Sequence, residues 1–333
     1  MSGFDGKIII IDADPDFYYG EISKQDFIHI INRGKEINNI ELAIAEYTNR
    51  THNEYFKEHA LDPRRSLGLK LLGNLKDKKV LDYGCGLGPL GIMAANWGAH
   101  VTFVDSCLLR LEAALLRAKQ YDLSNTYFIA CKTWNSLPND LQLFDVIILN
   151  GILEWVATTA KSTFDNVIET QLNFLSKMQH LLSPNGVIFL AIENRFALQY
   201  FMGYPEDHTE IKFLSLMSRE EANKLHQELK GNEFTTWTWS LNDYKTLLPK
   251  VNLCLSDAYA IFPDYRFPRL IINLKDPLGL KNGMSMEKYE ASLELKKQFI
   301  EYIFEMGLIE HFPYSYGLLL KKGVKNGRSS VIS

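Results

Sequence analysis

Short apolar, β-branched runs alternate with longer helical patterns through the middle of the chain, from residue 79 onward. In chain order the apolar runs are KVLDYG, HVTFVD, TYFIAC, FDVIILNG and NGVIFLAIEN. Helical patterns such as PLGIMAANWG and SCLLRLEAALLRAKQYDL separate them. Buried strands that alternate with helices are typical of a parallel sheet with helices on both faces. The pattern therefore predicts a doubly wound, mostly parallel α/β fold over residues 76–278.

This alternation stops after residue 194, in an aromatic-rich stretch that contains one charged helical segment, SREEANKLHQELKG. We expect a helical insertion at about 195–240, after the fifth strand. A capped helix follows, because Ser240 and Asp243 have the spacing of a capping box. Two further β-like runs, joined by a proline-rich turn in CLSDAYAIFPDYRFPRLIINL, predict an antiparallel hairpin that finishes the sheet.

The two ends of the chain carry less signal. Residues 1–75 contain helical segments, and we interpret them as an N-terminal helical cap. Residues 279–320 are predicted to form a C-terminal helical extension, in which Ser285 would be a helix N-cap. The polar residues 321–333 are predicted to form a flexible tail.

The composition adds mainly exclusions. A net charge of -4 does not favour a nucleic-acid partner. No apolar stretch of about 18 residues exists to span a membrane, and the first residues lack the basic flank and cleavage site of a signal peptide. The four cysteines have no metal-binding spacing, so the sequence predicts neither a metal site nor a disulfide framework. These features fit a cytoplasmic protein with reduced thiols, which could form a homo-oligomer.

The strongest local signal is the glycine loop VLDYGCGLGPLG, residues 80–91, which follows a strand and opens a helix. Glycines in this context let backbone N–H groups approach a ligand at a helix N-terminus. Gly86, Gly88 and Gly91 alone form the GxGxxG pattern of a dinucleotide site. Asp82 argues for another ligand, because a carboxylate before the first glycine would repel a pyrophosphate and attract an ammonium group.

The spacing Asp-x-Gly-x-Gly-x-Gly, which begins at Asp82, resembles motif I of class I S-adenosylmethionine-dependent methyltransferases. Asp105 is a second match, since it ends the next apolar run, close to the separation of about 20 residues expected for an acid that binds ribose hydroxyls. The resemblance implies a Rossmann-like sheet of seven strands with an antiparallel last hairpin, and S-adenosyl-L-methionine as the cofactor. The cofactor-binding residues that it implies are Asp82, Gly84, Cys85, Gly86, Gly88, Asp105, Ser106, Thr133, Trp134, Asn150 and Gly151. Trp134 could equally be a core aromatic, and Cys85 a small packing residue.

Asn150-Gly151-Ile152-Leu153 stands where the nucleic-acid and protein-amide methyltransferases of this superfamily carry Asn/Asp-Pro-Pro-Tyr/Phe. This departure favours a small-molecule acceptor. The segments LAIENRFALQYFMGYPEDHT and YAIFPDYRFPRLI resemble methyltransferases associated with bacterial surface-polysaccharide and related glycan pathways. The resemblance implies O-methylation of a sugar, glycan or related small polar metabolite. The alternatives are a catalytically silent partner subunit with this fold and an NAD-dependent oxidoreductase.

The acceptor-side candidates follow the fifth strand, at the edge where open α/β sheets bind ligands. Methyl transfer to a hydroxyl requires alignment of the acceptor and removal of a proton. His208 could accept that proton, with Asp207 or Glu206 orienting it or binding acceptor hydroxyls. Alternatively, it is an exposed turn histidine, or one that fastens the insertion to the sheet by hydrogen bonds. Glu193 could bind the acceptor or cap neighbouring N–H groups. We therefore predict His208, Glu193 and Asp207 as catalytic residues.

Three other residues are candidates on more general grounds. Glu154 lies shortly after Asn150, and His59 belongs to the N-terminal segment that could close over the cofactor. Arg195 could attract an anionic acceptor or pair with a local acid.

Overall fold

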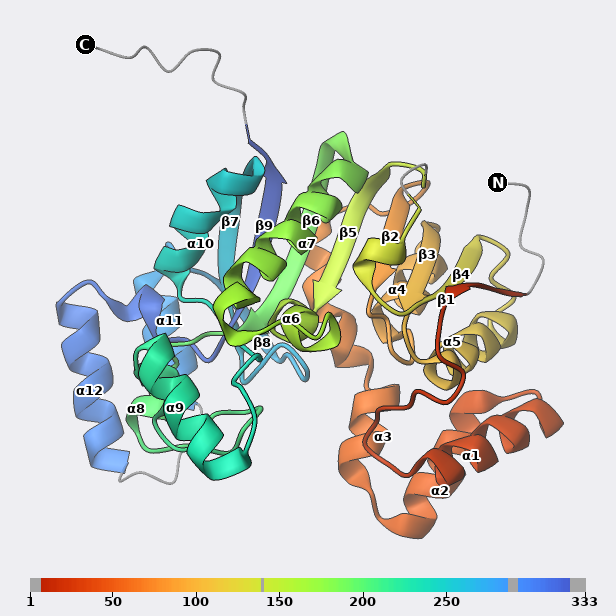
Figure 1. Ribbon diagram of the computed structural model, residues 1–333, viewed down its shortest axis with the longest axis horizontal. Helices are drawn as coiled ribbons and strands as arrows, with labels where there is room; N and C mark the ends of the chain where they lie inside the picture. The colour runs from red at the N-terminus through yellow and green to blue at the C-terminus, as the bar shows by residue number, and fades with distance from the viewer. Residues whose placement is uncertain (1–6, 139–140, 287–292, 324–333) are drawn as a thin grey trace.

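The computed structural model describes residues 7–138, 141–286 and 293–323 of the chain. A nine-stranded sheet forms its centre, with helices on both faces (Figure 1). The strands are β1 (Ile8–Asp12), β2 (Lys79–Tyr83), β3 (His100–Asp105), β4 (Thr126–Cys131), β5 (Phe144–Asn150), β6 (Leu182–Glu193), β7 (Leu253–Phe262), β8 (Leu270–Asn273) and β9 (Ser315–Lys322). Their order across the sheet is β1-β4-β3-β2-β5-β6-β9-β7-β8.

Helices of very different length surround the sheet. The α-helices are α1 (Lys24–Glu36), α2 (Ile40–Thr51), α3 (Glu54–Leu61), α4 (Pro89–Asn96), α5 (Leu108–Gln120), α6 (Val156–Thr159), α7 (Val167–Leu181), α8 (Leu198–Phe201), α9 (Arg219–Lys230), α10 (Leu241–Leu247), α11 (Pro277–Met286) and α12 (Leu293–Glu305). The 3₁₀ helices are η1 (Pro63–Leu72), η2 (Trp134–Ser136), η3 (Leu153–Trp155), η4 (Phe164–Asn166), η5 (Leu214–Leu216), η6 (Leu248–Val251) and η7 (Ile309–His311). Within the described residues, no helix has both the length and the apolar character that a membrane span requires.

The first six strands pair with one another only in parallel. From β2 to β6 both faces of the sheet are buried, which explains why these strand sequences read as continuous apolar runs, whereas the edge strand β1 is largely exposed. In β5, Ile147 and Leu149 belong to the apolar cluster beneath α7, whereas Val146 and Ile148 belong to the cluster beneath α4 and α5. The prediction of a doubly wound, mostly parallel α/β sheet is confirmed.

The prediction of seven strands is wrong, because β1 and β9 add two strands to the predicted seven. At one edge, β1 pairs in parallel with β4, so the N-terminal segment is not wholly helical. Its sequence, IIIID, is rich in β-branched residues, which favour extended backbone. At the other edge, β8 pairs with β7 in the predicted antiparallel hairpin.

The hairpin does not lie beside the fifth strand of the alternating pattern, because β9 is inserted between β6 and β7. Strand β9 is antiparallel to both neighbours. The predicted helical extension 279–320 is therefore wrong over residues 315–320, and the predicted flexible tail is wrong at Lys321 and Lys322, which end β9. The run SYGLLLKK has no strong β-branched signal, and its strand conformation depends on backbone partners on both sides. The rest of the predicted tail, residues 324–333, lies outside the described residues.

Two further predictions from the sequence concern helix caps. Ser240 and Asp243 form the predicted capping box at the start of α10, with the Ser240 hydroxyl accepting from the Asp243 N–H and the Asp243 carboxylate accepting from the Ser240 N–H. The expectation for Ser285 is wrong, since this residue lies in the last turn of α11 and its hydroxyl donates to the Lys281 carbonyl. A serine inside a helix can satisfy its hydroxyl in this way without capping it.

The N-terminal helices and the insertion lie at the same end of the sheet. In Figure 1, α1–α3 and α8–α9 lie below the sheet, at the end to which the β5 arrowhead points. Phe27 and Phe56 of the N-terminal helices pack with Leu87 of the glycine loop and Ala113 of α5 in one buried cluster. The cap is thereby fixed directly against the glycine loop.

Strand β9 gives a stability prediction. Leu318 is fully buried in the core between β6 and β7, so Leu318→Ala should lower the free energy of unfolding by about 2–5 kcal/mol. The matched control is Leu278→Ala at the exposed start of α11, where the change should stay within about 0.5 kcal/mol. Urea unfolding followed by circular dichroism measures both. Equal effects of the two substitutions would contradict an internal β9.

Candidate active site

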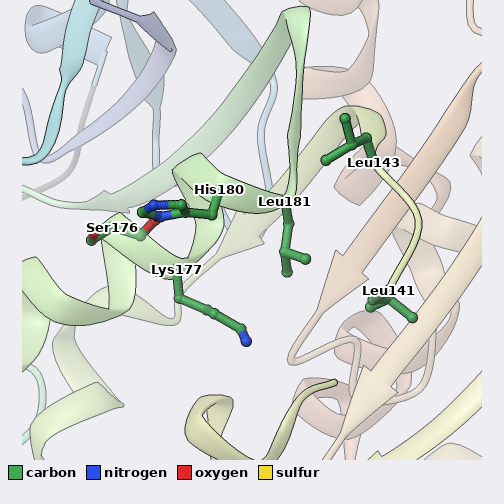
Figure 2. Close-up of a pocket in the computed structure, with 6 residues that line it drawn as sticks. All are labelled: Leu141, Leu143, Ser176, Lys177, His180 and Leu181. Carbon is green, nitrogen blue, oxygen red and sulfur yellow. The ribbon is translucent and has the colours of Figure 1, made fainter. Parts of the chain in front are cut away.

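Four acidic or amide side chains stand at the carboxyl ends of parallel strands. Asp82 and Asp105 lie at the ends of β2 and β3, and Asn150 and Glu193 end β5 and β6. Parallel strands end at the same edge of a sheet, so these polar side chains gather at one edge, where open α/β sheets bind ligands. Figure 2 shows a different pocket, between the end of α7 and the segment before β5, lined by Leu141, Leu143, Ser176, Lys177, His180 and Leu181. That pocket lies at the amino end of β5, away from the glycine loop.

The glycine loop has the backbone geometry that its sequence predicts. Gly84, Gly86 and Gly88 have φ values of 68°, 55° and 73°, a region that other L-residues rarely adopt. A Cβ at Gly84 would also overlap the side chain of Ile152. Gly88 is the N-cap of α4, so the loop leads directly into a helix N-terminus, while the N–H groups of Gly84, Gly86 and Gly88 are hydrogen-bonded within the protein.

Asp82 is buried beneath this loop, where its carboxylate accepts a hydrogen bond from the Gly91 N–H at 2.9 Å. Burial raises the pKa of Asp82 to about 7, against the opposing effects of the Gly91 hydrogen bond and the positive charge of Arg65. A Cβ at Gly91 would overlap both Phe103 and the Asp82 carboxylate. Gly91 thus permits close packing of α4 on the strands.

Asp105 already has three donors around its carboxylate. It accepts from the N–H groups of Gly86 and Cys107, both at 2.8 Å. The Tyr19 hydroxyl, from the segment before α1, reaches both oxygens at 3.1 and 2.9 Å. Arg110 lies over the Tyr19 ring at 4.6 Å and pairs with Glu21 at 3.0 Å, which holds this segment against the loop.

The other residues implied by the resemblance occupy varied positions. Cys85 is buried in the loop, and burial raises the pKa of its thiol well above the usual value, as expected for a packing residue. Ser106 is half-buried immediately after Asp105. The Thr133 carbonyl accepts from the Ser136 N–H, and Trp134 packs against the core, edge to face with Phe174.

Asn150 ends β5, and Gly151 follows it beside the residues that come after β7. Gly151 has a φ of 69°, and a Cβ there would overlap the Tyr265 hydroxyl. Tyr265 donates to Glu193 at 3.1 Å, so the ends of β5, β6 and β7 meet at one point.

Three carboxylate and imidazole side chains converge at this point. Glu154, from η3, and Glu193 and His208 each offer one ligand atom, and these atoms lie within 4.8 Å of one another. Both glutamates are completely or almost completely buried, at 0% and 1% exposure. Among the described residues, three of these carboxylate oxygens have no hydrogen-bond partner: both oxygens of Glu154 and the Oε2 atom of Glu193.

Glu206 orients His208. Its carboxylate lies 2.7 Å from the imidazole Nδ1 and accepts from the N–H groups of His208 and Thr209 and from the Thr209 hydroxyl. Trp155 packs edge to face against the imidazole, at 5.0 Å between ring centroids. The segment that follows Pro205 is therefore a built part of the site and not an exposed turn.

Asp207 has another set of partners. Its carboxylate accepts from the hydroxyls of Tyr200 and Tyr314, the latter at 2.6 Å, and lies 3.5 Å from the Arg266 guanidinium. Arg266 also lies 3.9 Å from Glu193. Asp207 therefore connects the insertion to the residues after β7, and Glu206 alone of these two acids contacts the imidazole.

The close carboxylates shift the pKa values of the cluster. Burial raises the pKa of Glu154 to about 8, with a further rise from the negative charge of Glu193. Burial also raises the pKa of Glu193, against the positive charges of His208 and Arg266. Burial opposes the charged form of His208, but the hydrogen bond to Glu206 and the neighbouring carboxylates raise its pKa to about 10.

Two of the more general candidates have structural partners. Arg195 donates to the carbonyls of Ser215 and Met217 and lies over the Trp237 ring at 4.4 Å, so its partners in the structure are parts of the insertion. His59 lies 3.0 Å from Glu21 and stacks on Tyr55. Burial, followed by the charges of Arg65 and Arg110, lowers the pKa of His59 well below its usual value.

Sequence reasoning missed four residues of the site. Arg65 is buried, donates to the His59 carbonyl, and has an Nε without a hydrogen-bond partner among the described residues. Tyr19 and Arg110 have no motif around them. Arg266 lies in the segment YAIFPDYRFPRLI, whose resemblance to methyltransferases of glycan pathways gave no reason to select the arginine.

A glycine loop at a helix N-terminus, an acid below it and a second acid on the next strand define a cofactor site of the nucleotide-binding α/β class. The family model described as "Methyltransferase domain" matches residues 74–247, and the chain belongs to this family. Its cofactor is S-adenosyl-L-methionine, which decides against the NAD alternative for the same glycines.

Curated relatives and solved structures are similar to parts of the chain. The ubiquinone biosynthesis O-methyltransferase of Histophilus somni is 35% identical over 141 residues, which cover 41% of this chain and 54% of that enzyme, so the chain spans about half its length. The enzyme of the same name from Actinobacillus pleuropneumoniae is 30% identical over 207 residues, with 56% and 83% covered. The CcbJ methyltransferase from Streptomyces caelestis is similar in structure at 13% identity, with a TM-score of 0.47 over 78% of this chain and 90% of that chain.

The contact between Tyr19 and Asp105 gives a binding prediction. A cofactor ribose that bonds to Asp105 must displace the Tyr19 hydroxyl. We expect Tyr19→Phe to bind S-adenosylhomocysteine roughly tenfold more tightly, because a hydrogen bond to a charged group contributes about 1.5–3 kcal/mol. Isothermal titration calorimetry measures the change.

Tyr18→Phe is the matched control, since the Tyr18 hydroxyl donates to the Ile22 carbonyl and not to Asp105. Its affinity should equal that of the unchanged protein. Weaker binding by Tyr19→Phe would mean that the hydroxyl contributes to cofactor binding.

Proposed function

We propose that the protein transfers the methyl group of S-adenosylmethionine to a hydroxyl of a sugar, a glycan or a related small polar metabolite. The observation that carries this proposal is the cluster of Glu154, Glu193 and His208 at the same sheet edge as the glycine loop. In-line transfer from a sulfonium needs an aligned acceptor and a group that takes its proton. This cluster supplies carboxylate and imidazole groups next to the end of β5.

At the cofactor end, Asp82 would face the ammonium group of the cofactor and Asp105 its ribose hydroxyls. Arg65 would face the carboxylate of the cofactor, because its guanidinium is buried with an unpartnered Nε and is close enough to lower the pKa of Asp82. An arginine and an aspartate side by side match the two opposite charges of an amino acid. The methionyl part of the cofactor would lie along the backbone of the loop from Gly84 to Gly88.

At the acceptor end, Glu193 and His208 would bind the reacting hydroxyl, and the Glu193 carboxylate would take up its proton, because a pKa of about 10 keeps the His208 imidazole protonated at neutral pH. Glu193 is held by Tyr265, and His208 is held by Glu206, so both side chains have fixed orientations. Asp207 would be a positioning residue that acts through Arg266, which also faces Glu193.

The polar lining of this end supports a hydroxylated acceptor. Carboxylates accept from sugar hydroxyls, and Trp155, Tyr265 and Tyr314 add aromatic surface beside them. The curated relatives are ubiquinone biosynthesis O-methyltransferases, which makes a hydroxylated aromatic ring the second candidate acceptor. Both acceptors present a hydroxyl to the same groups.

The buried carboxyl of Asp82 predicts a pH dependence of cofactor binding. In the free protein its pKa is about 7, and the cofactor ammonium would lower it, so binding below pH 7 releases a proton. The affinity for S-adenosylhomocysteine should therefore rise by up to about tenfold per pH unit from pH 5.5 to 7 and level off above, as calorimetry would measure. Asp82→Asn should bind more weakly and lose this slope, whereas the surface control Asp122→Asn should keep it. A slope retained in Asp82→Asn would assign the proton to another group.

The methyl-transfer proposal has a direct test in mass spectrometry of candidate sugars, glycans and hydroxylated aromatics incubated with the enzyme and methyl-labelled cofactor. Glu193→Gln and His208→Ala should each lower kcat by about 10²–10⁴-fold and leave the affinity for S-adenosylhomocysteine nearly unchanged. His180→Gln, at the opposite end of β5, is the control and should keep full turnover.

The result that rejects the proposal is a folded protein that binds S-adenosylhomocysteine but methylates no hydroxylated compound of either class. That result would favour a catalytically silent partner subunit. Loss of cofactor affinity in His208→Ala would instead make His208 a structural residue.

A further inference from the structure

We propose that Glu154, Glu193 and His208 bind one divalent metal ion, Mn²⁺ or Mg²⁺, at the acceptor end of the site. The proposal rests on the proposed function and deepens it, because the ion would hold the reacting hydroxyl. It also reverses the expectation from the sequence that the protein has no metal site, since the three ligands come from η3, the end of β6 and the insertion and have no spacing in common.

The first argument is the set of unpartnered oxygens. Burial of a carboxylate without hydrogen bonds costs several kcal/mol, and such groups in proteins are paired or coordinate metals. Three of the four carboxylate oxygens of Glu154 and Glu193 have no hydrogen-bond partner within the described residues. A divalent cation is a ligand that satisfies several such oxygens at once.

The second argument is distance. The three ligand atoms lie within 4.8 Å of one another. In an octahedral site with bonds near 2.1 Å, neighbouring ligands are about 3.0 Å apart and opposite ligands about 4.2 Å apart. Movements of up to about 1 Å by each ligand atom therefore bring the three side chains into coordination, a distance that side-chain rotation covers.

The third argument is the support around the ligands. A metal-binding histidine typically donates its other ring N–H to a carboxylate, which fixes the tautomer. Glu206 has this relation to His208, at 2.7 Å from Nδ1, and leaves Nε2 as the nitrogen for a metal. Tyr265 similarly donates to Oε1 of Glu193 and leaves Oε2 unpartnered.

The positive side chains nearby do not exclude a bound cation. Arg266 lies 3.9 Å from Glu193, but its guanidinium is shared with Asp264, Asp207 and the Tyr314 hydroxyl. No lysine or arginine forms an ion pair with Glu154 within the described residues. The alternative source of compensation is protons on Glu154 and His208, which a metal ion would replace.

The ligand types indicate the metal. Two carboxylates and one imidazole, without a thiolate, suit a hard to intermediate divalent ion, and a six-coordinate ion with three protein ligands keeps positions for an acceptor hydroxyl. The ion would lower the pKa of that hydroxyl and orient it. Glu154, Glu193 and His208 would then hold the acceptor through the ion, and the hydroxyl proton would pass to water as the new O–C bond forms and the S–C bond of the cofactor breaks.

The test is Mn²⁺ binding to the full chain after removal of metals with a chelator. Isothermal titration, with loss of the free Mn²⁺ resonance in electron paramagnetic spectra, should show one site per chain. Glu154→Gln and Glu193→Gln should each weaken binding more than tenfold, and Glu206→Gln should weaken it by about 10–100-fold through His208. The surface variant Glu228→Gln is the control and should bind Mn²⁺ as the unchanged protein does.

S-adenosylhomocysteine binding shows that each variant is folded, and Glu206→Gln keeps the test valid if a ligand variant does not fold. Absence of Mn²⁺ binding at millimolar concentration, or equal binding by Glu154→Gln, would overturn the metal site. Methyl transfer that is unaffected by chelator would overturn it as well and would leave the proposed function standing. Specific Mn²⁺ binding without methylation of any hydroxyl would reject the proposed function and support the metal site.

Discussion

The burial of acidic side chains at one edge of a parallel sheet is the constraint on which the rest of the structure depends. Asp82, Asp105 and Glu193 lie at the ends of strands that are covered on both faces. Glu154 lies in η3, shortly after β5. A buried carboxylate requires donors or cations, which the strands themselves do not supply because their N–H groups are used in the sheet. The elements around this edge either supply these donors and cations or leave a carboxylate to be paired by a bound ligand.

The compensation comes from segments that are far apart in the sequence. Tyr19 reaches Asp105 from the segment before α1, and Arg65 reaches the surroundings of Asp82 from η1. At the other end, Tyr265 and Arg266 reach Glu193 because β7 runs parallel to β6 across β9 and ends at the same edge. The insertion of β9 thus has a consequence for chemistry: it places the residue before it, Tyr314, next to Asp207.

The sequence was sufficient for what depends on local pattern. The alternating runs predicted the parallel sheet, and the resemblance of the loop from Asp82 to Gly88 to a methyltransferase motif implied the cofactor. Strand β9 was missed because its conformation depends on partners on both sides, and Ser285 because a serine hydroxyl can bond inside a helix as well as cap one. Of the acids near His208, the sequence could not separate Glu206 from Asp207, since only the fold brings Tyr200, Tyr314 and Arg266 to the second.

The two ends of the site differ in how their charges are satisfied. At the cofactor end, each acid already has donors from the protein, so a cofactor must replace or accommodate them, as with the Tyr19 hydroxyl on Asp105. At the acceptor end, Glu154 has none, although its neighbours are held rigidly by Tyr265 and Glu206. Rigid groups with unmet bonding capacity lower the cost of binding, because the protein does not have to reorganise when the partner arrives. The structure therefore concentrates its unsatisfied carboxylate oxygens at the point where the proposed acceptor hydroxyl would receive the methyl group.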